Sequence, residues 1–242
     1  MIINFFYQTE GGLNTDMTEN TDTKNNGQHK DFYGYGGIES LDRYIKIKYG
    51  NGWEQKSSRC IEGILNFKQN SFGTEDQNNC TLASITRIMK YYADQGLNGI
   101  PSNINDIYCI VREIGVKHGY DPTKSGLFRD LFIYTPFEIK TMVRETWGKF
   151  GYVGSKAQNK YYRKLKIIKN SIDDMNPVLL NIAGGDYKGH TVTVIGYKVF
   201  GNNRECQPDM SFVTVLDGWS EEVRYIDWTK FGITLANVTR IL

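Results

Sequence analysis

Hydrophobic and polar positions along the chain change their spacing near residue 176, and this change separates predicted helices from predicted strands. Before it, apolar residues recur at intervals of three and four, which predicts helices at 38–49, 81–92, 103–118, 137–147 and 161–175. After it, β-branched and apolar residues alternate or form short runs, which predicts strands at 178–182, 190–200, 212–217 and 223–227. Helices followed by an antiparallel sheet indicate an α+β fold of two packed layers.

The helix predicted at 81–92 is apolar on more than one face, which is typical of the buried helix of a domain. Cys80 stands at its N-terminus, directly after the polar run Asp76-Gln-Asn-Asn. Free backbone N–H groups and the helix dipole favour an anion there, so they lower the pKa of a thiol. The same N–H groups can stabilise the oxyanion that forms on a substrate carbonyl. Cys80 is therefore a candidate nucleophile.

The four cysteines, at 60, 80, 109 and 206, form no C-x-x-C pair, and no histidine lies near them at the spacing of metal ligands. Two disulfides are formally possible, but no spacing demands them. We therefore expect no metal site, and nothing else in the sequence calls for a cofactor. Cys60 and Cys109 lie beside isoleucines, so we interpret them as small buried hydrophobic residues.

His190 is the candidate base among the three histidines. His29 lies in a polar N-terminal stretch, and His118 lies where a helix ends, a place that favours a cation. His190, in contrast, begins a predicted strand after the glycine-rich loop 184–189.

Asp217 ends the strand that follows His190. If position 192 pairs with 215 and 194 with 213, then 190 lies directly opposite 217, with Cβ atoms about 4.5–5.5 Å apart. The Asp217 carboxylate would then fix the imidazole tautomer. Asp217 before Gly218 is also a common turn pattern, and Asp186 is a weaker candidate for the same role.

This order of residues resembles that of papain-like cysteine peptidases, in which a cysteine heads a buried helix, a histidine begins one strand and a third residue ends the next. Three segments resemble a bacterial branch related to bacteriocin-leader (double-glycine) peptidases, at 78–92, 177–181 and 189–197. The resemblance covers about residues 70–230. It implies a papain-like fold, in which a helical layer with the buried nucleophile-bearing helix packs on an antiparallel β-sheet. It also implies Cys80 as nucleophile, His190 as base, Asp217 as orienting acid and Trp219 as a shield over their contact.

The sequence departs from the papain-like pattern at the side chain that donates to the oxyanion. Papain-like enzymes usually place a glutamine about six residues before the cysteine, where this chain has Thr74. Gln77 is the first candidate for that role, and Asn79 is the second. The separation of His190 and Asp217 is also longer than in compact members, which we attribute to an inserted loop at 201–211.

The function that the resemblance implies is peptide-bond cleavage through an acyl-enzyme on Cys80, so the expected partner is a peptide or protein substrate. One alternative is a transglutaminase-like acyl transferase on the same scaffold, in which an amine replaces water. Another is a papain-like binding protein without turnover, which the missing glutamine would favour. Sequence does not separate the peptidase from the acyl transferase, because the triad chemistry is shared. The intact Cys80, His190 and Asp217 argue against the binding protein.

Charge and hydropathy argue against nucleic acid and membrane partners. Lys and Arg number 29 against 27 for Asp and Glu, so no strong field would hold a polyanion. No run approaches the roughly 18–20 apolar residues of a membrane helix. The first residues are too short an apolar run, without a basic start, for a signal peptide. The compartment stays open, with a lean toward a secreted protein whose leader is absent from this sequence.

The chain divides into three parts by composition. Residues 1–31 are predicted to form a flexible arm, since residues 8–31 are too polar to offset the entropy of ordering. Residues 32–60 form an accessory or pro-region-like segment, and residues 61–242 form the catalytic domain. The accessory segment is rich in aromatic residues, so we expect it to dock on the domain. We prefer a brace on its back to an inhibitor across the cleft, because no evident cleavable linker separates the two.

Overall fold

One antiparallel sheet organises the computed structural model, which describes residues 36–73, 75–76, 78–123, 136–183, 187, 189–202, 207–231 and 236–241. The sheet runs in the order β2-β7-β3-β4-β5-β6, and β1 pairs with β4. The strands are β1 (Trp53–Cys60), β2 (Ala157–Lys160), β3 (Val178–Ile182), β4 (His190–Asn202), β5 (Met210–Leu216), β6 (Arg224–Asp227) and β7 (Ala236–Ile241). The arm predicted at 1–31 lies outside the described residues.

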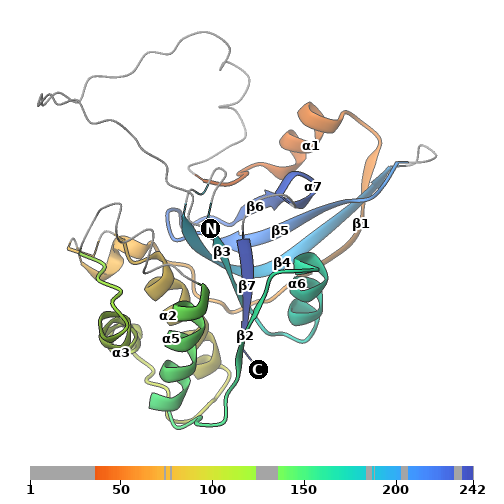
Figure 1. The fold of residues 1–242 in the computed structure, drawn as a ribbon. Coiled ribbons are helices and arrows are strands. Elements are labelled where there is room, and N and C mark those ends of the chain that lie inside the picture. The colour runs from red at the N-terminus through yellow and green to blue at the C-terminus, as the bar shows by residue number, and fades with distance from the viewer. Residues whose placement is uncertain are drawn as a thin grey trace, which may run out of the picture.

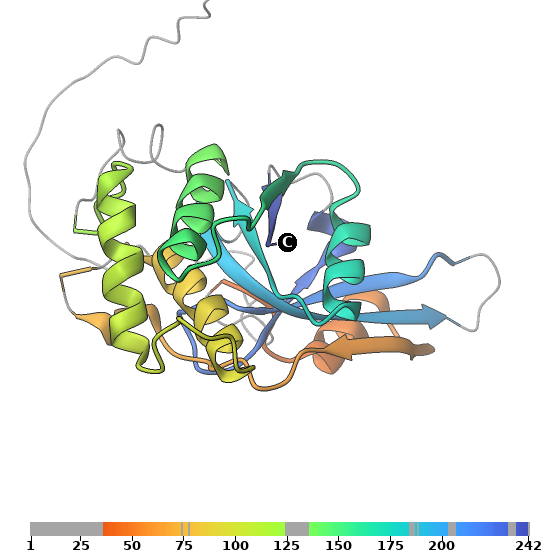
Figure 2. The ribbon, with the colours of Figure 1, turned by 90° about the horizontal axis from the view of Figure 1, so that it is seen from below.

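Helices cover both faces of this sheet (Figures 1 and 2). They are α1 (Leu41–Tyr49), the 3-10 helix η1 (Gln69–Phe72), α2 (Cys80–Asp94), α3 (Ile104–Lys117), α5 (Pro136–Lys149), α6 (Lys164–Asp173) and α7 (Trp228–Phe231). Figures 1 and 2 show α2, α3 and α5 gathered at one end of the sheet, whereas α1 and α6 lie toward the other end. Among the described helices, none is long and apolar enough to span a membrane.

The long strand β4 is the centre of the sheet. Along one edge it pairs first with β3 and then with β1, and along the other edge it pairs with β5. Gly196 makes the approach of β1 possible, since a Cβ atom there would lie 2.6 Å from the carbonyl oxygen of Arg59. β1, which begins at Trp53, is therefore part of the same sheet as β4.

The two faces of β4 pack against different helices. Val192 and Val194 point into the apolar cluster that includes Ile168 and Ile172 of α6. The alternate residues, Thr191 and Thr193, face α2, because successive side chains of a strand point to opposite faces.

A polar seam joins α2 to β4 on that second face. The hydroxyls of Thr81 and Thr191 lie 2.9 Å apart, and the Ser84 hydroxyl donates to the Thr191 carbonyl at 3.1 Å. One helical turn later, Nη1 of the fully buried Arg87 donates to Thr193 Oγ1 at 3.0 Å. These bonds satisfy buried polar groups, and they fix the position of α2 along β4.

The predicted α+β layout is confirmed, and so is the burial of the helix that carries Cys80. Asn103 caps α3, since its side chain accepts a hydrogen bond from the Asn105 N–H. Three strands were not predicted. The side chains of β1 are almost all exposed and polar, so its sequence lacks an alternating pattern. β2 is a polar segment of four residues, and β7 follows the last segment for which a strand was expected.

Two predictions were wrong. Cys60 and Cys109 are exposed rather than buried, because Cys60 ends a strand whose side chains are almost all exposed and Cys109 is not among the buried residues of α3. The β4–β5 register differs by two residues from the one expected, since Val194 pairs with Val215, and a bulge follows it. A shift by two keeps every side chain on its face, so the alternating pattern is equally compatible with both registers.

The accessory segment docks on the sheet through α1. Tyr44 and Ile45 of this helix pack with Phe200 of β4 and Phe212 of β5 in a separate apolar cluster. The hydroxyl of Tyr44 also donates to Asp227 Oδ2 at 2.8 Å. Figure 2 shows α1 and α6 on opposite sides of the long strands.

Replacement of Tyr44 tests how firmly α1 is docked. Tyr44→Ala should lower the free energy of unfolding by about 3–5 kcal/mol, because it opens a cavity and leaves a buried acceptor without one donor. Tyr161→Ala is the matched control, since Tyr161 is 52% exposed; its cost should stay within about 0.5 kcal/mol. Denaturant unfolding measures both, and equal values for the two variants would show that α1 contributes nothing.

Candidate active site

Cys80 is the first residue of α2, and only 5% of its surface is exposed. The Asn79 carbonyl accepts the first helical hydrogen bond, from the Ala83 N–H at 2.8 Å. The N–H groups of the first turn have no partner within the helix. The thiol therefore lies where backbone donors and the positive end of the helix dipole gather.

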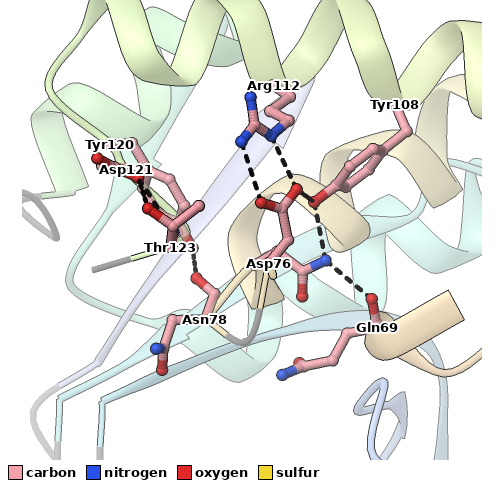
Figure 3. Close-up of polar contacts among 9 residues, drawn as sticks. Gln69, Asp76, Asn78, Tyr108, Arg112, Tyr120, Asp121 and Thr123 are labelled. Atoms are coloured by element: carbon pink, nitrogen blue, oxygen red, sulfur yellow. Dashed lines mark hydrogen bonds and ion pairs between the residues drawn. The ribbon is translucent and has the colours of Figure 1, made fainter. Parts of the chain in front are cut away.

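The loop before Cys80 is tied to α3 by charged and polar groups (Figure 3). Arg112 binds both carboxylate oxygens of Asp76, at 2.8 and 3.1 Å. Tyr108 donates its hydroxyl proton to the same carboxylate and accepts a hydrogen bond from Asn79 Nδ2, each at 2.8 Å. The bidentate contact of Arg112 with Asp76 is geometrically specific, so it holds the loop before α2 in place.

Asn79, one of the two predicted oxyanion donors, is committed to that network. Its Nδ2 donates to Tyr108 and also to the carbonyl oxygen of Gln69 at 2.8 Å. Both hydrogens of the amide are thus used, and the contacts give this side chain a positioning role. Gln77, the other predicted donor, and Thr74 lie outside the described residues.

His190 begins β4 and directly precedes Thr191, the strand residue that contacts α2. Its Nε2 lies 2.7 Å from the main-chain carbonyl oxygen of Asp217. A carbonyl oxygen only accepts, so Nε2 carries a proton. In the neutral ring Nδ1 is then the unprotonated nitrogen, and it is the one left for the thiol. The contact with Asp217 thus selects the tautomer that can accept a proton from Cys80.

The Asp217 side chain serves the turn that follows it. Its Oδ1 accepts hydrogen bonds from the N–H groups of Trp219 and Ser220, at 2.9 and 3.1 Å. Its Oδ2 is buried and has no hydrogen-bond partner within the described ranges. Burial raises the pKa of Asp217, although the two N–H groups and the charge of His190 act in the opposite direction. We expected the carboxylate to orient the imidazole, whereas in the structure the main-chain carbonyl makes that bond.

The environment of Cys80 favours the thiolate. Burial is the largest influence and by itself raises the pKa of the thiol. The charge of His190 and a hydrogen bond with its ring outweigh burial, aided by the Thr191 N–H and the Thr81 hydroxyl, and they lower the pKa of Cys80 to about 7. The thiol of Cys60 differs from that of Cys80, because desolvation and the charge of Glu62 raise its pKa.

Two aromatic rings, those of Tyr187 and Trp219, lie beside the imidazole of His190, and we call them the aromatic wall. The Trp219 ring stacks on His190 with centroids 3.9 Å apart. The Tyr187 ring lies parallel to the imidazole at 5.7 Å and stacks on Trp219 at 5.4 Å. Trp219 was predicted as a shield. Tyr187 was missed, and the one available signal was an aromatic residue within an otherwise permissive glycine-rich loop.

Gln69 was also missed, and it links the two loops of the site. Its N–H donates to the Gly218 carbonyl at 2.7 Å, and its own carbonyl accepts from Asn79. It lies eleven residues before Cys80 at the start of η1, where no periodic pattern marks it. The start of α2 and the turn after β5 are therefore held together by one main-chain segment.

The described residues contain no group of three or more His, Cys, Asp or Glu side chains that could hold a metal ion. His118 takes the structural role expected of it, with Nε2 at 2.7 Å from Glu145. The structure thus brings Cys80, His190, Asp217 and Trp219 to one place. Asp186, the weaker candidate, lies outside the described residues.

Comparison with known proteins finds a matching family model and similar solved structures. The model of the Peptidase C39 like family matches residues 61–234. Among solved structures, a crystal structure described as a C39-like peptidase from Bacillus anthracis aligns with a TM-score of 0.44 and 12% identity, over 77% of this chain and 98% of that chain. The comparison with curated proteins found no match.

Alkylation tests the assignment of the nucleophile. With iodoacetamide near neutral pH, Cys80 should react faster than Cys60, although Cys60 is exposed and Cys80 is buried, because reaction follows the thiolate fraction. His190→Ala should slow Cys80 and leave Cys60 unchanged. Peptide mapping by mass spectrometry measures both rates. Faster labelling of Cys60 than of Cys80 in the unmodified protein would contradict the assignment of Cys80 as the nucleophile.

Proposed function

The chain belongs to the Peptidase C39 like family of papain-like cysteine peptidases, and we propose that it cleaves peptide bonds with Cys80 as nucleophile and His190 as base. The observation that carries this proposal is the bond from His190 Nε2 to the Asp217 carbonyl. It leaves Nδ1 as the proton acceptor beside a thiol whose pKa is already lowered. A peptidase implies a peptide or protein substrate.

The proposed reaction has two steps. The Cys80 thiolate attacks the peptide carbonyl, and protonated His190 passes its proton to the leaving amine as the C–N bond breaks. Water, deprotonated by His190, then attacks the thioester and releases the new carboxylate with the thiolate. Between the two steps the acyl group is held on Sγ of Cys80.

The oxyanion of each tetrahedral intermediate needs donors at the start of α2. The main-chain N–H of Cys80 is the first, because the first N–H groups of a helix have no internal partner. We place the side chain of Gln77 as the second, on the basis of its position three residues before the nucleophile. Asn79 supports these donors through its bonds to Tyr108 and Gln69.

Trp219 is proposed to exclude water from the bond between His190 and Asp217. Its ring covers the imidazole at 3.9 Å. A hydrogen bond in a site without water is electrostatically stronger than the same bond in water, so the cover keeps the tautomer fixed during turnover.

Hydrolysis in heavy-oxygen water tests the proposed function. The protein is incubated with a library of proteome-derived peptides, and the products are read by mass spectrometry. We expect new C-termini that carry one heavy oxygen atom from water, and none with Cys80→Ala. Amine adducts without heavy oxygen would favour the transferase reading. No product in either protein, with Cys80 unreactive toward a peptide electrophile, would contradict the proposal.

Substitution of Asp217 separates its carbonyl from its carboxylate. Asp217→Asn keeps the main-chain carbonyl and an oxygen that can accept from Trp219 and Ser220, so kcat/KM should stay within about tenfold. Asp217→Ala removes that acceptor and lets the turn shift; because small misplacements of catalytic groups are costly, we expect a loss on the order of 10²-fold. If the asparagine variant loses as much as the alanine variant, the negative charge itself orients His190.

A further inference from the structure

Residues 36–39, which we call the strap, run along β6 beside the aromatic wall. The N–H of Ile38 donates to the Tyr225 carbonyl, and the Tyr225 N–H donates back to Ile38, each at 2.9 Å. Next to this bridge, Arg224 Nη1 lies 3.0 Å from the Glu39 carboxylate. Ile38 is buried in the cluster that holds α1. The strap is therefore fixed on the sheet by main-chain bonds, an ion pair and apolar contact.

The two glycines of the strap lie against the wall. A Cβ atom on Gly36 would be 2.4 Å from Cζ3 of Trp219 and 2.8 Å from Cε1 of Tyr187. A Cβ atom on Gly37 would be 2.4 Å from the Tyr187 hydroxyl oxygen and 2.8 Å from Cβ of Arg224. These distances leave no room for a side chain, so the main chain of the strap is in direct contact with both rings.

The same two rings stack on His190, and the Trp219 contact at 3.9 Å is the closer one. A displacement of either ring therefore reaches the imidazole. The bond from His190 to Asp217 and the hydrogen bond to Cys80 both depend on where that ring lies. Since the family match begins at residue 61, the strap lies outside the matched residues.

We propose that the strap is a positioning element of the active site, which holds Tyr187 and Trp219 so that His190 keeps its place between Cys80 and Asp217. The inference rests on the proposed function of Cys80 and His190. It assigns the accessory segment a role in the geometry of the catalytic pair, in addition to its packing through α1.

Gly37→Ala is the most direct test. Gly37 does not have a positive φ, so the substitution adds only a steric contact, and the nearest atom is the end of the Tyr187 side chain. Gly36→Ala adds a contact with Trp219 together with the strain of φ +98°. Gly50→Ala is the matched control, because Gly50 has φ +82° and nothing lies within 4 Å of an added Cβ. It carries backbone strain without touching the wall.

The readout is the pH dependence of Cys80 alkylation, with melting temperature measured in parallel. In Gly36→Ala and Gly37→Ala the midpoint should rise by about 0.5–1 pH unit toward that of an ordinary thiol, because His190 no longer supports the thiolate. Peptidase kcat/KM should fall by about tenfold or more. Gly50→Ala should lose melting temperature and keep the midpoint of the unmodified protein.

Glu39→Gln provides a variant that adds no atom to the wall. It weakens the ion pair with Arg224, and Glu39 is more than half exposed, so the fold is retained. We expect a smaller rise of the midpoint in the same direction. Wild-type midpoints in both Gly37→Ala and Glu39→Gln would overturn the role of the strap. An ordinary thiol midpoint in the unmodified protein would instead overturn the proposed function.

Discussion

The contact between the first turns of α2 and the start of β4 is the constraint on which the site depends. Thr81, Ser84 and Arg87 follow one another along the helix, and each bonds to Thr191 or Thr193. Because these partners are buried, sliding the helix along the strand would leave several polar groups unsatisfied, at about 1–3 kcal/mol for each group. The same seam places Cys80, the first residue of α2, beside His190, the first residue of β4.

The imidazole is held from several directions by groups of different kinds. The Asp217 carbonyl accepts from Nε2, Trp219 covers one face of the ring, and Cys80 forms a hydrogen bond with the ring. The Asp217 side chain shapes the turn from which that carbonyl and Trp219 both come. On the far side of the thiol, Arg112, Asp76 and Tyr108 fix the loop that precedes it. The main chain of Gln69 links these two sides of the site, since it bonds to both Gly218 and Asn79.

Sequence reasoning singled out Cys80 and His190 as the candidate nucleophile and base because each begins a strongly patterned element. Cys80 follows a polar run and begins a helix that is apolar almost all round, and His190 begins an alternating strand. The alternation assigns side chains to faces but leaves the register free by two residues, which is why Asp217 was expected opposite His190. Continuing the observed register of Val194 with Val215 beyond the paired residues brings position 190 opposite Trp219.

Other parts of the site have no sequence signal of their own. The bond to His190 comes from a main-chain carbonyl, and every residue carries one, so sequence pointed to the Asp217 carboxylate instead. Gln69 acts through its main chain as well. The strap lies against the aromatic wall through two glycines, and a glycine gives no periodic signal because it contributes only the absence of a side chain. β1 pairs with β4 through its main chain, while its side chains are almost all polar and exposed, so no alternating pattern marks it.

The tautomer of His190 is the most direct test of the account. With isotope-labelled histidine, and His29 and His118 replaced by glutamine, the chemical shifts of the two ring nitrogens can be assigned to His190 alone. In the neutral ring the account predicts a proton on Nε2, donated to the Asp217 carbonyl, and a bare Nδ1. A neutral ring that carries its proton on Nδ1 would contradict the account, because Nδ1 could then not take the proton from Cys80.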